Sequence, residues 1–188
     1  MLIIGITGTL GAGKGTIVDY LVKKKGLVHF SVRDYISEEI IRRGLAVNRD
    51  SMVIVANDLR AKHSPSYIVD KLYERALLSG NNCVIESIRT PGEIDSLREK
   101  GNFVLFAVDA KPEKRFERIV ERNSETDRIS FLTFIENEQR EMNSDDPNKQ
   151  NLKKCIEMAD HVFENNKSIA ELQQQVEKVI STLSKSYA

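Results

Sequence analysis

Five short apolar segments alternate along the chain with longer segments of helical periodicity. The apolar segments cover residues 2–6, 27–30, 83–88, 103–108 and 161–163. They are nearly continuous rather than alternating, which is typical of strands buried on both faces. The pattern predicts an α/β fold in which one five-stranded parallel sheet carries helices on both faces.

Helical signals fill the stretches between these strands. Apolar residues recur at spacings of three and four, and capping residues mark the ends. The run Thr90-Pro91-Gly92-Glu93, for example, combines a capping box with Pro at the first helical position. The predicted helices cover residues 15–25, 35–43, 64–80, 90–101 and 112–122, and a last helix follows residue 168.

Length and composition favour one domain over residues 1–188. A chain of 188 residues can bury a sizeable core, and its 28 basic residues balance its 28 acidic residues. Such a balance gives no overall attraction to nucleic acid or to anionic membranes. No apolar stretch approaches the roughly 20 residues of a membrane span. The first strand begins at the N-terminus without a signal peptide before it. We therefore expect a cytoplasmic protein, and the oligomeric state stays open.

A glycine-rich loop follows the first predicted strand and leads into the first helix. Its sequence, Gly8-Thr9-Leu10-Gly11-Ala12-Gly13-Lys14-Gly15-Thr16, fits the phosphate-binding pattern G-x-x-x-x-G-K. Glycines let the loop aim backbone N–H groups at phosphates, and the helix adds a positive dipole end. We expect this loop to bind ATP, with Lys14 at the β- and γ-phosphates. The expected nucleotide-binding residues are Gly8, Gly11, Ala12, Gly13, Lys14, Gly15 and Thr16.

The ending Lys-Gly-Thr of this loop resembles adenylate kinases and related nucleoside monophosphate kinases. Residues 31–34, Ser-Val-Arg-Asp, resemble the Ser-Thr-Gly-Asp of that family, and residues 86–90, Glu-Ser-Ile-Arg-Thr, resemble its Asp-Gly-Phe-Pro-Arg-Thr, one residue shorter. The resemblance implies a P-loop NTPase fold. It also implies that Asp34 lies near the transferred phosphate, Arg89 at the acceptor phosphate, and Glu86 near magnesium.

The loop departs from the usual pattern at the residue that normally contacts magnesium. Gly15 stands where a Ser or Thr with a hydroxyl group usually follows the lysine. We expect Thr16 and Glu86 to hold Mg²⁺, largely through water molecules, with Asp34 behind them.

Three arginines after the fourth strand lie where the resembled family has its lid arginines. Arg115, Arg118 and Arg122 fall at spacings of three and four, which places them on one helical face. Glutamates recur every four residues nearby, so much of this face is expected to be an exposed ladder of ion pairs. We expect Arg118 and Arg122 to reach phosphate. Arg128 is expected to close from a short lid, within residues 118–147.

The acceptor side is expected in a helical segment over residues 35–79. The resembled kinases usually carry a second acceptor arginine where this chain has Ser37. The arginines available to replace it are Arg33, Arg42, Arg43 and Arg60. Residues 48–63 could recognise the acceptor, and a plain connecting segment is the alternative for them.

The C-terminal part shows a second resemblance. Residues 159–166, Ala-Asp-His-Val-Phe-Glu-Asn-Asn, are similar to the end of dephospho-coenzyme A kinases. Residues 88–89 and 115–118 also resemble an archaeal group of predicted nucleotide kinases.

Three functions follow as hypotheses. The first is a small-molecule kinase that moves the γ-phosphoryl group of ATP to a nucleoside or deoxynucleoside monophosphate. The second is phosphorylation of a ribose hydroxyl on dephospho-coenzyme A. The third is a nucleotide-binding switch without kinase activity. Residues 148–151 and 166–169 begin with Asn-Lys but lack the Asp of the GTPase motif Asn-Lys-x-Asp, which disfavours a guanine-specific switch.

Overall fold

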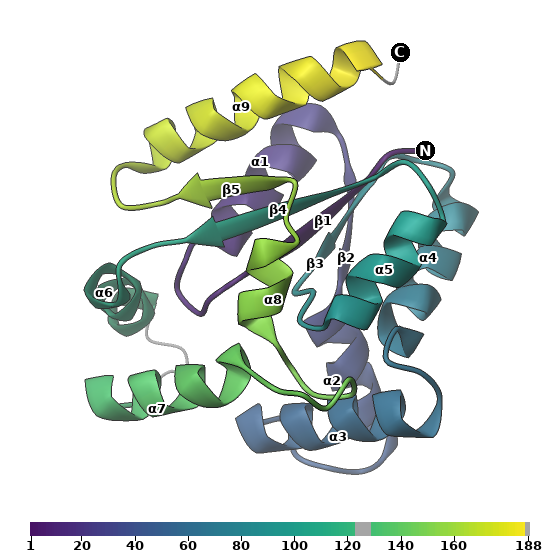
Figure 1. The fold of residues 1–188 in the computed structure, drawn as a ribbon, viewed down its shortest axis with the longest axis vertical. Coiled ribbons are helices and arrows are strands. Elements are labelled where there is room, and N and C mark those ends of the chain that lie inside the picture. Colours follow the sequence, from purple (N-terminus) through teal and green to yellow (C-terminus); the bar gives the residue numbers. More distant parts are fainter. Residues whose placement is uncertain (123–128, 187–188) are drawn as a thin grey trace.

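Five parallel strands form the centre of the computed structural model, which describes residues 1–122 and 129–186 (Figure 1). Their order across the sheet is β2-β3-β1-β4-β5, and every pair of neighbours is parallel. The strands are β1 Ile3–Gly8, β2 Val28–Ser31, β3 Cys83–Glu86, β4 Phe103–Asp109 and β5 His161–Glu164. The fold class predicted from the sequence is therefore confirmed.

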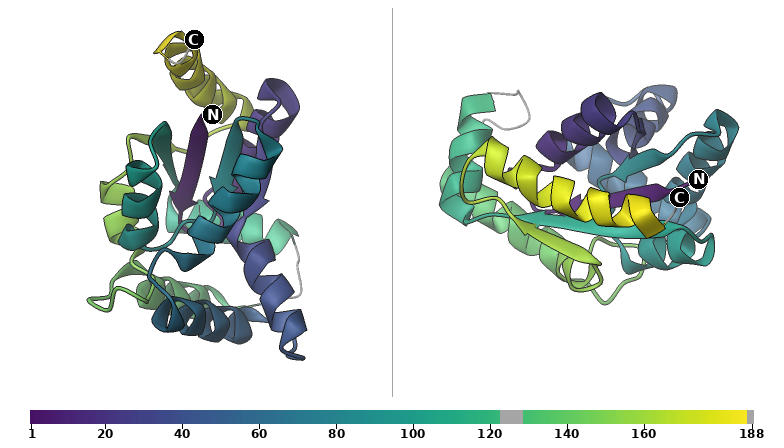
Figure 2. Two further views of the ribbon diagram at one scale, coloured as in Figure 1. Left: turned by 90° about the vertical axis from the view of Figure 1, so that its right-hand side faces the viewer. Right: turned by 90° about the horizontal axis from the view of Figure 1, so that it is seen from above.

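Helices cover both faces of this sheet (Figure 2). One face carries α1 and α9, and the other carries α2, α3, α4, α5 and α8. Helices α6 and α7 follow β4, and the two helices contact each other. The bounds are α1 Lys14–Lys25, α2 Val32–Arg42, α3 Arg49–Lys62, α4 Tyr67–Ser79, α5 Pro91–Glu99, α6 Pro112–Arg122, α7 Phe131–Met142, α8 Leu152–Glu157 and α9 Ile169–Ser186.

Two apolar cores result, one on each side of the sheet. Successive side chains of a strand point to opposite faces, so Ile3 packs with α2–α5 while Ile4 packs with α1 and α9. Both isoleucines are fully buried. This burial on both faces explains why the strands read as continuous apolar runs in the sequence.

Local capping sets where several helices begin. Ser31 Oγ accepts a hydrogen bond from the Asp34 N–H at 3.1 Å, so α2 begins at Val32, earlier than the predicted residue 35. Ser31 is thus the residue that caps α2. The predicted capping box at Thr90 and Glu93 is present and begins α5.

One expectation from the sequence needs correction. Residues 48–63 are not a plain connecting segment, because α3 occupies Arg49–Lys62. A capping box begins it: Asn48 Oδ1 accepts from the Ser51 N–H, and Ser51 Oγ accepts from the Asn48 N–H. The short helix α8 was also not predicted.

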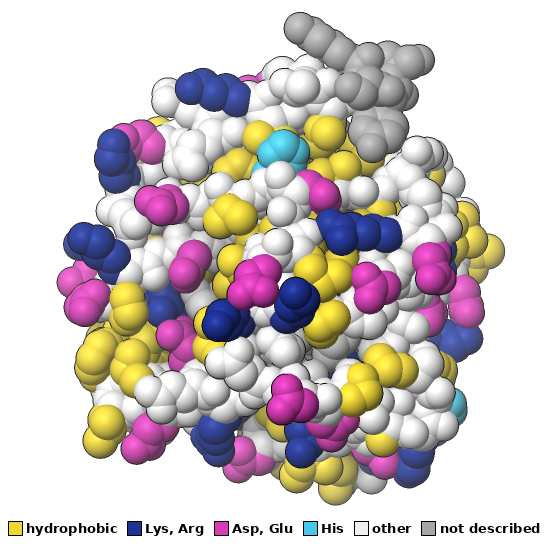
Figure 3. Space-filling view, in the orientation of Figure 1, with side chains coloured by type: hydrophobic (Ala, Val, Ile, Leu, Met, Phe, Trp, Pro, Cys, Tyr) yellow, Lys and Arg dark blue, Asp and Glu magenta, His cyan; other side chains and the backbone are white. Residues whose placement is uncertain are grey.

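One face of the molecule shows how basic and acidic side chains are distributed. On the face in Figure 3, basic and acidic side chains are interspersed over the helices. Among the residues that the structure describes, no helix is long and apolar enough to cross a membrane.

Candidate functional site

The glycine-rich loop connects β1 to α1 and takes a conformation that its glycines permit. Gly8 and Gly13 have φ angles of 140° and 110°. A Cβ atom at Gly13 would lie 2.3 Å from Asn165 Nδ2, and one at Gly8 would lie 2.1 Å from the Val108 carbonyl oxygen. Side chains are therefore excluded at both positions by conformation and by space.

Lys14 occupies the first turn of α1, and its side chain turns back over the loop. Its Nζ donates hydrogen bonds of 2.9 Å to the carbonyl oxygens of Gly8 and Thr9. Burial, together with the positive charge of Arg89, lowers the pKa of Lys14 to about 7, against the opposite effect of Glu86 and Glu141. A bound anion would favour the protonated, charged form of Lys14 and would therefore raise this pKa.

Glu86 ends β3 beside the loop and faces His29 of the neighbouring strand. Its Oε2 lies 3.2 Å from His29 Nε2. Burial alone would raise the pKa of Glu86, but the hydrogen bond with His29 and the charges of Lys14 and Arg33 hold that pKa below its ordinary value. Glu86 therefore carries a negative charge at neutral pH, which a carboxylate needs in order to interact with a cation.

Arg89 lies just past β3, where a glutamate from α7 holds it. Arg89 Nη1 donates to Glu141 Oε2 and to Gln150 Oε1, at 2.6 Å each. The other carboxylate oxygen of Glu141 pairs with Arg49, at the start of α3. The Glu141 carboxylate thus bridges the guanidinium groups of Arg89 and Arg49. An anionic group of a substrate would meet two arginines that already pair with a carboxylate.

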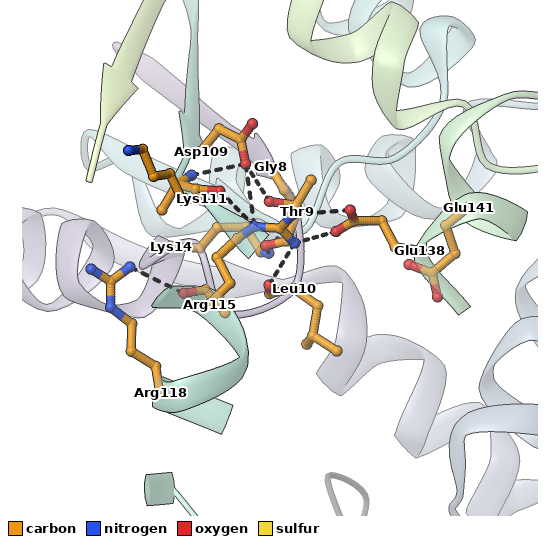
Figure 4. Close-up of polar contacts among 12 residues, drawn as sticks. Gly8, Thr9, Leu10, Lys14, Asp109, Lys111, Arg115, Arg118, Glu138 and Glu141 are labelled. Carbon is orange, nitrogen blue, oxygen red and sulfur yellow. Dashed lines mark hydrogen bonds and ion pairs between the residues drawn. The ribbon is translucent and has the colours of Figure 1, made fainter. Parts of the chain in front are cut away.

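Arg115 of α6 supports the glycine-rich loop (Figure 4). It is 3% exposed, and its guanidinium donates to the carbonyl oxygens of Ala110 and Leu10 and pairs with Glu138 of α7. Arg118, one turn later, donates to the carbonyl oxygen of Asn165 at 2.7 Å. These contacts fasten α6 and α7 to the loop.

Asn165, after β5, completes the support of the loop. Its side-chain Nδ2 donates to the Ala12 carbonyl oxygen at 2.8 Å, and its own N–H donates to Asp109. The residue is buried. The resemblance of residues 159–166 to dephospho-coenzyme A kinases covers this position, but the sequence did not single it out.

A cavity of about 720 Å³ joins these groups. Its volume lies within the range of pockets that bury a small molecule. The loop and Lys14 line one part, and α2 and α3 line another with apolar and basic side chains. The predicted residues that line it are Gly11, Gly13, Lys14, Gly15, Thr16, Asp34, Glu86, Arg89, Arg118 and Arg122.

The remaining predicted residues differ in their positions. Gly8 and Ala12, expected to bind nucleotide, are not among the residues that line the cavity. Arg42 and Arg43 pair with Glu39 on α2 and do not line the cavity, whereas Arg33 and Arg60 do. Arg128 lies outside the described residues. Arg49 and Glu141 line the cavity and were not foreseen, because a sequence shows their charges but not that they meet.

Known proteins resemble this chain over most of its length. A sequence profile described as an AAA domain matches residues 4–144. A UPF0200 protein of Methanococcus vannielii is 32% identical over 168 residues, which cover 88% of this chain and 87% of that protein. The chain belongs to the family of this AAA-domain profile and to the UPF0200 proteins. A UPF0200 protein of Methanocaldococcus jannaschii is 30% identical and covers 97% of this chain and 91% of its own length.

Solved structures of small-molecule kinases share the fold. A gluconokinase from Sinorhizobium meliloti superposes with a TM-score of 0.62 at 13% identity, over 99% of this chain and 95% of that chain. A shikimate kinase from Aquifex aeolicus gives a TM-score of 0.54 at 16% identity, over 97% and 98%. At such low identities, these likenesses show a shared P-loop kinase-like fold and nothing beyond the fold. They carry no information on the acceptor.

Proposed function

We propose that this protein transfers the γ-phosphoryl group of ATP to a nucleoside or deoxynucleoside monophosphate. The observation that carries the proposal is that the glycine-rich loop and Lys14 line the same cavity as Arg89 and the helices α2 and α3. A kinase needs a donor site and an acceptor site that open onto one another. Residues 35–79 supply the acceptor side, and residues 118–147 supply Arg118, Arg122 and Glu141 as the lid side.

The chemistry needed is positioning and neutralisation of charge. In this proposal Lys14 binds the β- and γ-phosphates, and Arg118 and Arg122 approach the triphosphate from α6. Arg89 exchanges Glu141 for the phosphate of the acceptor. Asp34, in the first turn of α2, orients the acceptor.

The part of the cavity lined by α2 and α3 has apolar side chains of the kind that pack against a nucleotide base. Val32, Ile36 and Ala56 are buried side chains that line it, and Met52 and Val53 join them from α3. An apolar surface of this kind packs against a planar base, while the nearby arginines bind the phosphate.

Glu86 and Thr16 fit a magnesium ion held mainly by the nucleotide. No three His, Cys, Asp or Glu side chains gather to hold a metal within residues 1–122 and 129–186. The ion would therefore take most of its ligands from phosphate oxygens and water, and Glu86 would orient that water. Bound there, Mg²⁺ would neutralise charge on the transferred group.

Replacing Glu86 by Gln is expected to raise the Mg²⁺ concentration for half-maximal activity by about tenfold or more, because an amide holds metal-bound water less strongly. Titration of activity with Mg²⁺ measures this. Glu164→Gln, at the end of β5 and away from the cavity, is the matched control. An unchanged Mg²⁺ dependence in Glu86→Gln would remove this residue from the metal site.

Binding of ATP at pH 8 is expected to take up close to one proton. The pKa of Lys14 is about 7 in the ligand-free protein, so most molecules carry a neutral amine at pH 8. The triphosphate favours the ammonium form and raises that pKa, so a proton enters from the buffer. At pH 6 Lys14 is already charged and uptake at this group is small.

Calorimetry in buffers of different ionisation enthalpy measures this uptake. Lys14→Met should lose the uptake of this proton at pH 8. Equal uptake by the native protein and this variant would show that Lys14 does not contact the triphosphate.

A panel of acceptors tests the proposed function itself. ADP release would be followed with each nucleoside and deoxynucleoside monophosphate, with dephospho-coenzyme A and with no acceptor. The proposal expects turnover that depends on a monophosphate. Turnover with dephospho-coenzyme A alone would establish the alternative kinase, and ADP release that no acceptor stimulates would exclude both kinases.

A further inference from the structure

Arg60 of α3 is the largest fully buried side chain among the described residues, at 1% exposure. Its Nη2 and Nε donate to Glu93 Oε1 at 2.8 and 3.3 Å, and Glu93 is itself 0% exposed. The second oxygen of Glu93 accepts from the N–H groups of Arg89 and Thr90. Both oxygens of this carboxylate therefore have partners.

The remaining nitrogen of Arg60, Nη1, is buried and has no hydrogen-bond partner among the residues that the structure describes. Arg60 also lines the cavity that holds Lys14 and Arg89. Buried polar groups in folded proteins almost always have a partner, and because Arg60 lines the cavity, a ligand bound there is a source of the missing acceptor atom.

The position of Arg60 on α3 indicates which part of a ligand it would meet. Met52, Ala56 and Arg60 are spaced by four residues, so they lie along one face of the helix, and all three line the cavity. The first two contribute apolar side chains to the cavity wall, and Arg60 follows one turn later on the same face. A planar base packed on this wall would turn its edge toward Arg60.

The charges around Arg60 indicate which kind of atom the edge of the base should present to it. Arg60 and Glu93 neutralise each other, so a phosphate brought to Nη1 would add an uncompensated negative charge to a buried place. A carbonyl oxygen accepts the same hydrogen bond without adding charge. The acceptor phosphate is better matched by Arg89 and Arg49, which a carboxylate already bridges.

We propose that Arg60 is a specificity-determining residue, whose Nη1 donates to an oxo group on the edge of the acceptor base remote from the ribose. The acceptor class is then a monophosphate of a 6-oxopurine or a 4-oxopyrimidine. Adenine and cytosine carry an amino group at that position, and an amino group would set one donor against another. This inference rests on the proposed function and narrows its substrate class.

Two pairs of acceptors that differ at this one position provide the test. Inosine and adenosine monophosphates form one pair, and uridine and cytidine monophosphates form the other. We expect the oxo member of each pair to have the higher kcat/KM, by at least about tenfold, because an unpaired buried donor rejects the amino member. Equal values, or a preference for the amino members, would overturn the inference while leaving the proposed kinase intact. Failure of every monophosphate to act as acceptor would instead remove the proposed function, and this inference with it.

A double variant tests the role of Arg60 directly. Arg60→Met alone would leave the buried Glu93 carboxylate without its cation, so it is combined with Glu93→Gln, which preserves the capping box of α5. Thermal melting would verify that the double variant folds. We expect the preference within each pair to fall below about threefold, with the KM for ATP unchanged.

Arg43→Met is the control, since Arg43 also bridges two elements but lies outside the cavity. It should keep the preference of the native protein. Full oxo preference in the folded double variant would show that Arg60 does not read the base. If the double variant does not fold, the two acceptor pairs on the native protein still decide the inference.

Discussion

Replacing Lys14 by Met is expected to lower kcat by roughly a thousandfold, with the protein still folded. The ammonium of Lys14 is the cation placed on the loop itself, where Gly8 and Thr9 carbonyl oxygens hold it at 2.9 Å. In the proposed reaction it leaves these carbonyls for the β- and γ-phosphates and stabilises charge as the phosphoryl group departs. Methionine has a similar length and no charge, so the substitution removes the charge while the new side chain fills the space of the lysine.

Steady-state rates of ADP formation measure this effect. Lys24→Met, at the exposed end of the same helix, is the control and should retain native activity. A Lys14→Met protein that melts like the native protein and keeps more than about a tenth of its kcat would contradict the assignment of Lys14 to phosphoryl transfer.

Replacing Arg89 by Ala is expected to lower kcat/KM for the acceptor by about a thousandfold and to change the KM for ATP little. Arg89 makes short hydrogen bonds to Glu141 and Gln150, so its guanidinium is already oriented to bind an anion. Loss of a charge-assisted contact to the acceptor phosphate removes both binding and alignment. Kinetics at saturating ATP with varied acceptor separate the two effects.

A second readout distinguishes this role from a purely structural one. The charge of Arg89 contributes to the low pKa of Lys14. Arg89→Ala should therefore raise the pKa of Lys14 and reduce the proton uptake on ATP binding at pH 8. Arg75→Gln, which removes an exposed pair with Glu38, should alter neither quantity. Equal loss of activity toward ATP and acceptor would indicate a disturbed fold instead.

The fold was accessible from the sequence because its signals are local. Burial on both faces produces continuous apolar strands, and the glycine-rich loop, the Thr90–Glu93 capping box and Pro91 are each encoded within a few residues. Such features predict where elements begin and what the loop can bind. Of the residues expected to bind nucleotide, Gly11, Gly13, Lys14, Gly15 and Thr16 line the cavity, whereas Gly8 and Ala12 do not.

Helix α3 escaped prediction for a physical reason. Its centre, Val53-Ile54-Val55, is a β-branched run with low helix propensity, and Ile54 points into solvent at 64% exposure. Packing of Val55, Ala56 and Leu59 against the sheet-facing core decides its conformation. Tertiary burial outweighs local preference here.

The acceptor side depends on partners distant in the chain. Arg89 meets Glu141 across 52 residues, and Arg60 meets Glu93 across 33. A single sequence shows these charges without showing that they meet, so neither pair could be foreseen. Arg60 was only one of several candidates for a second acceptor arginine, and its burial now separates it from Arg42 and Arg43.

Transfer of an isotopic label tests the central claim most directly. The native protein would be incubated with ATP labelled at the γ-phosphate, Mg²⁺ and a nucleoside monophosphate, and the products would be separated and identified by mass. The account predicts that the label appears as the β-phosphate of a nucleoside diphosphate. Label found only in inorganic phosphate, or only on a ribose hydroxyl of dephospho-coenzyme A when that acceptor is supplied, would contradict it.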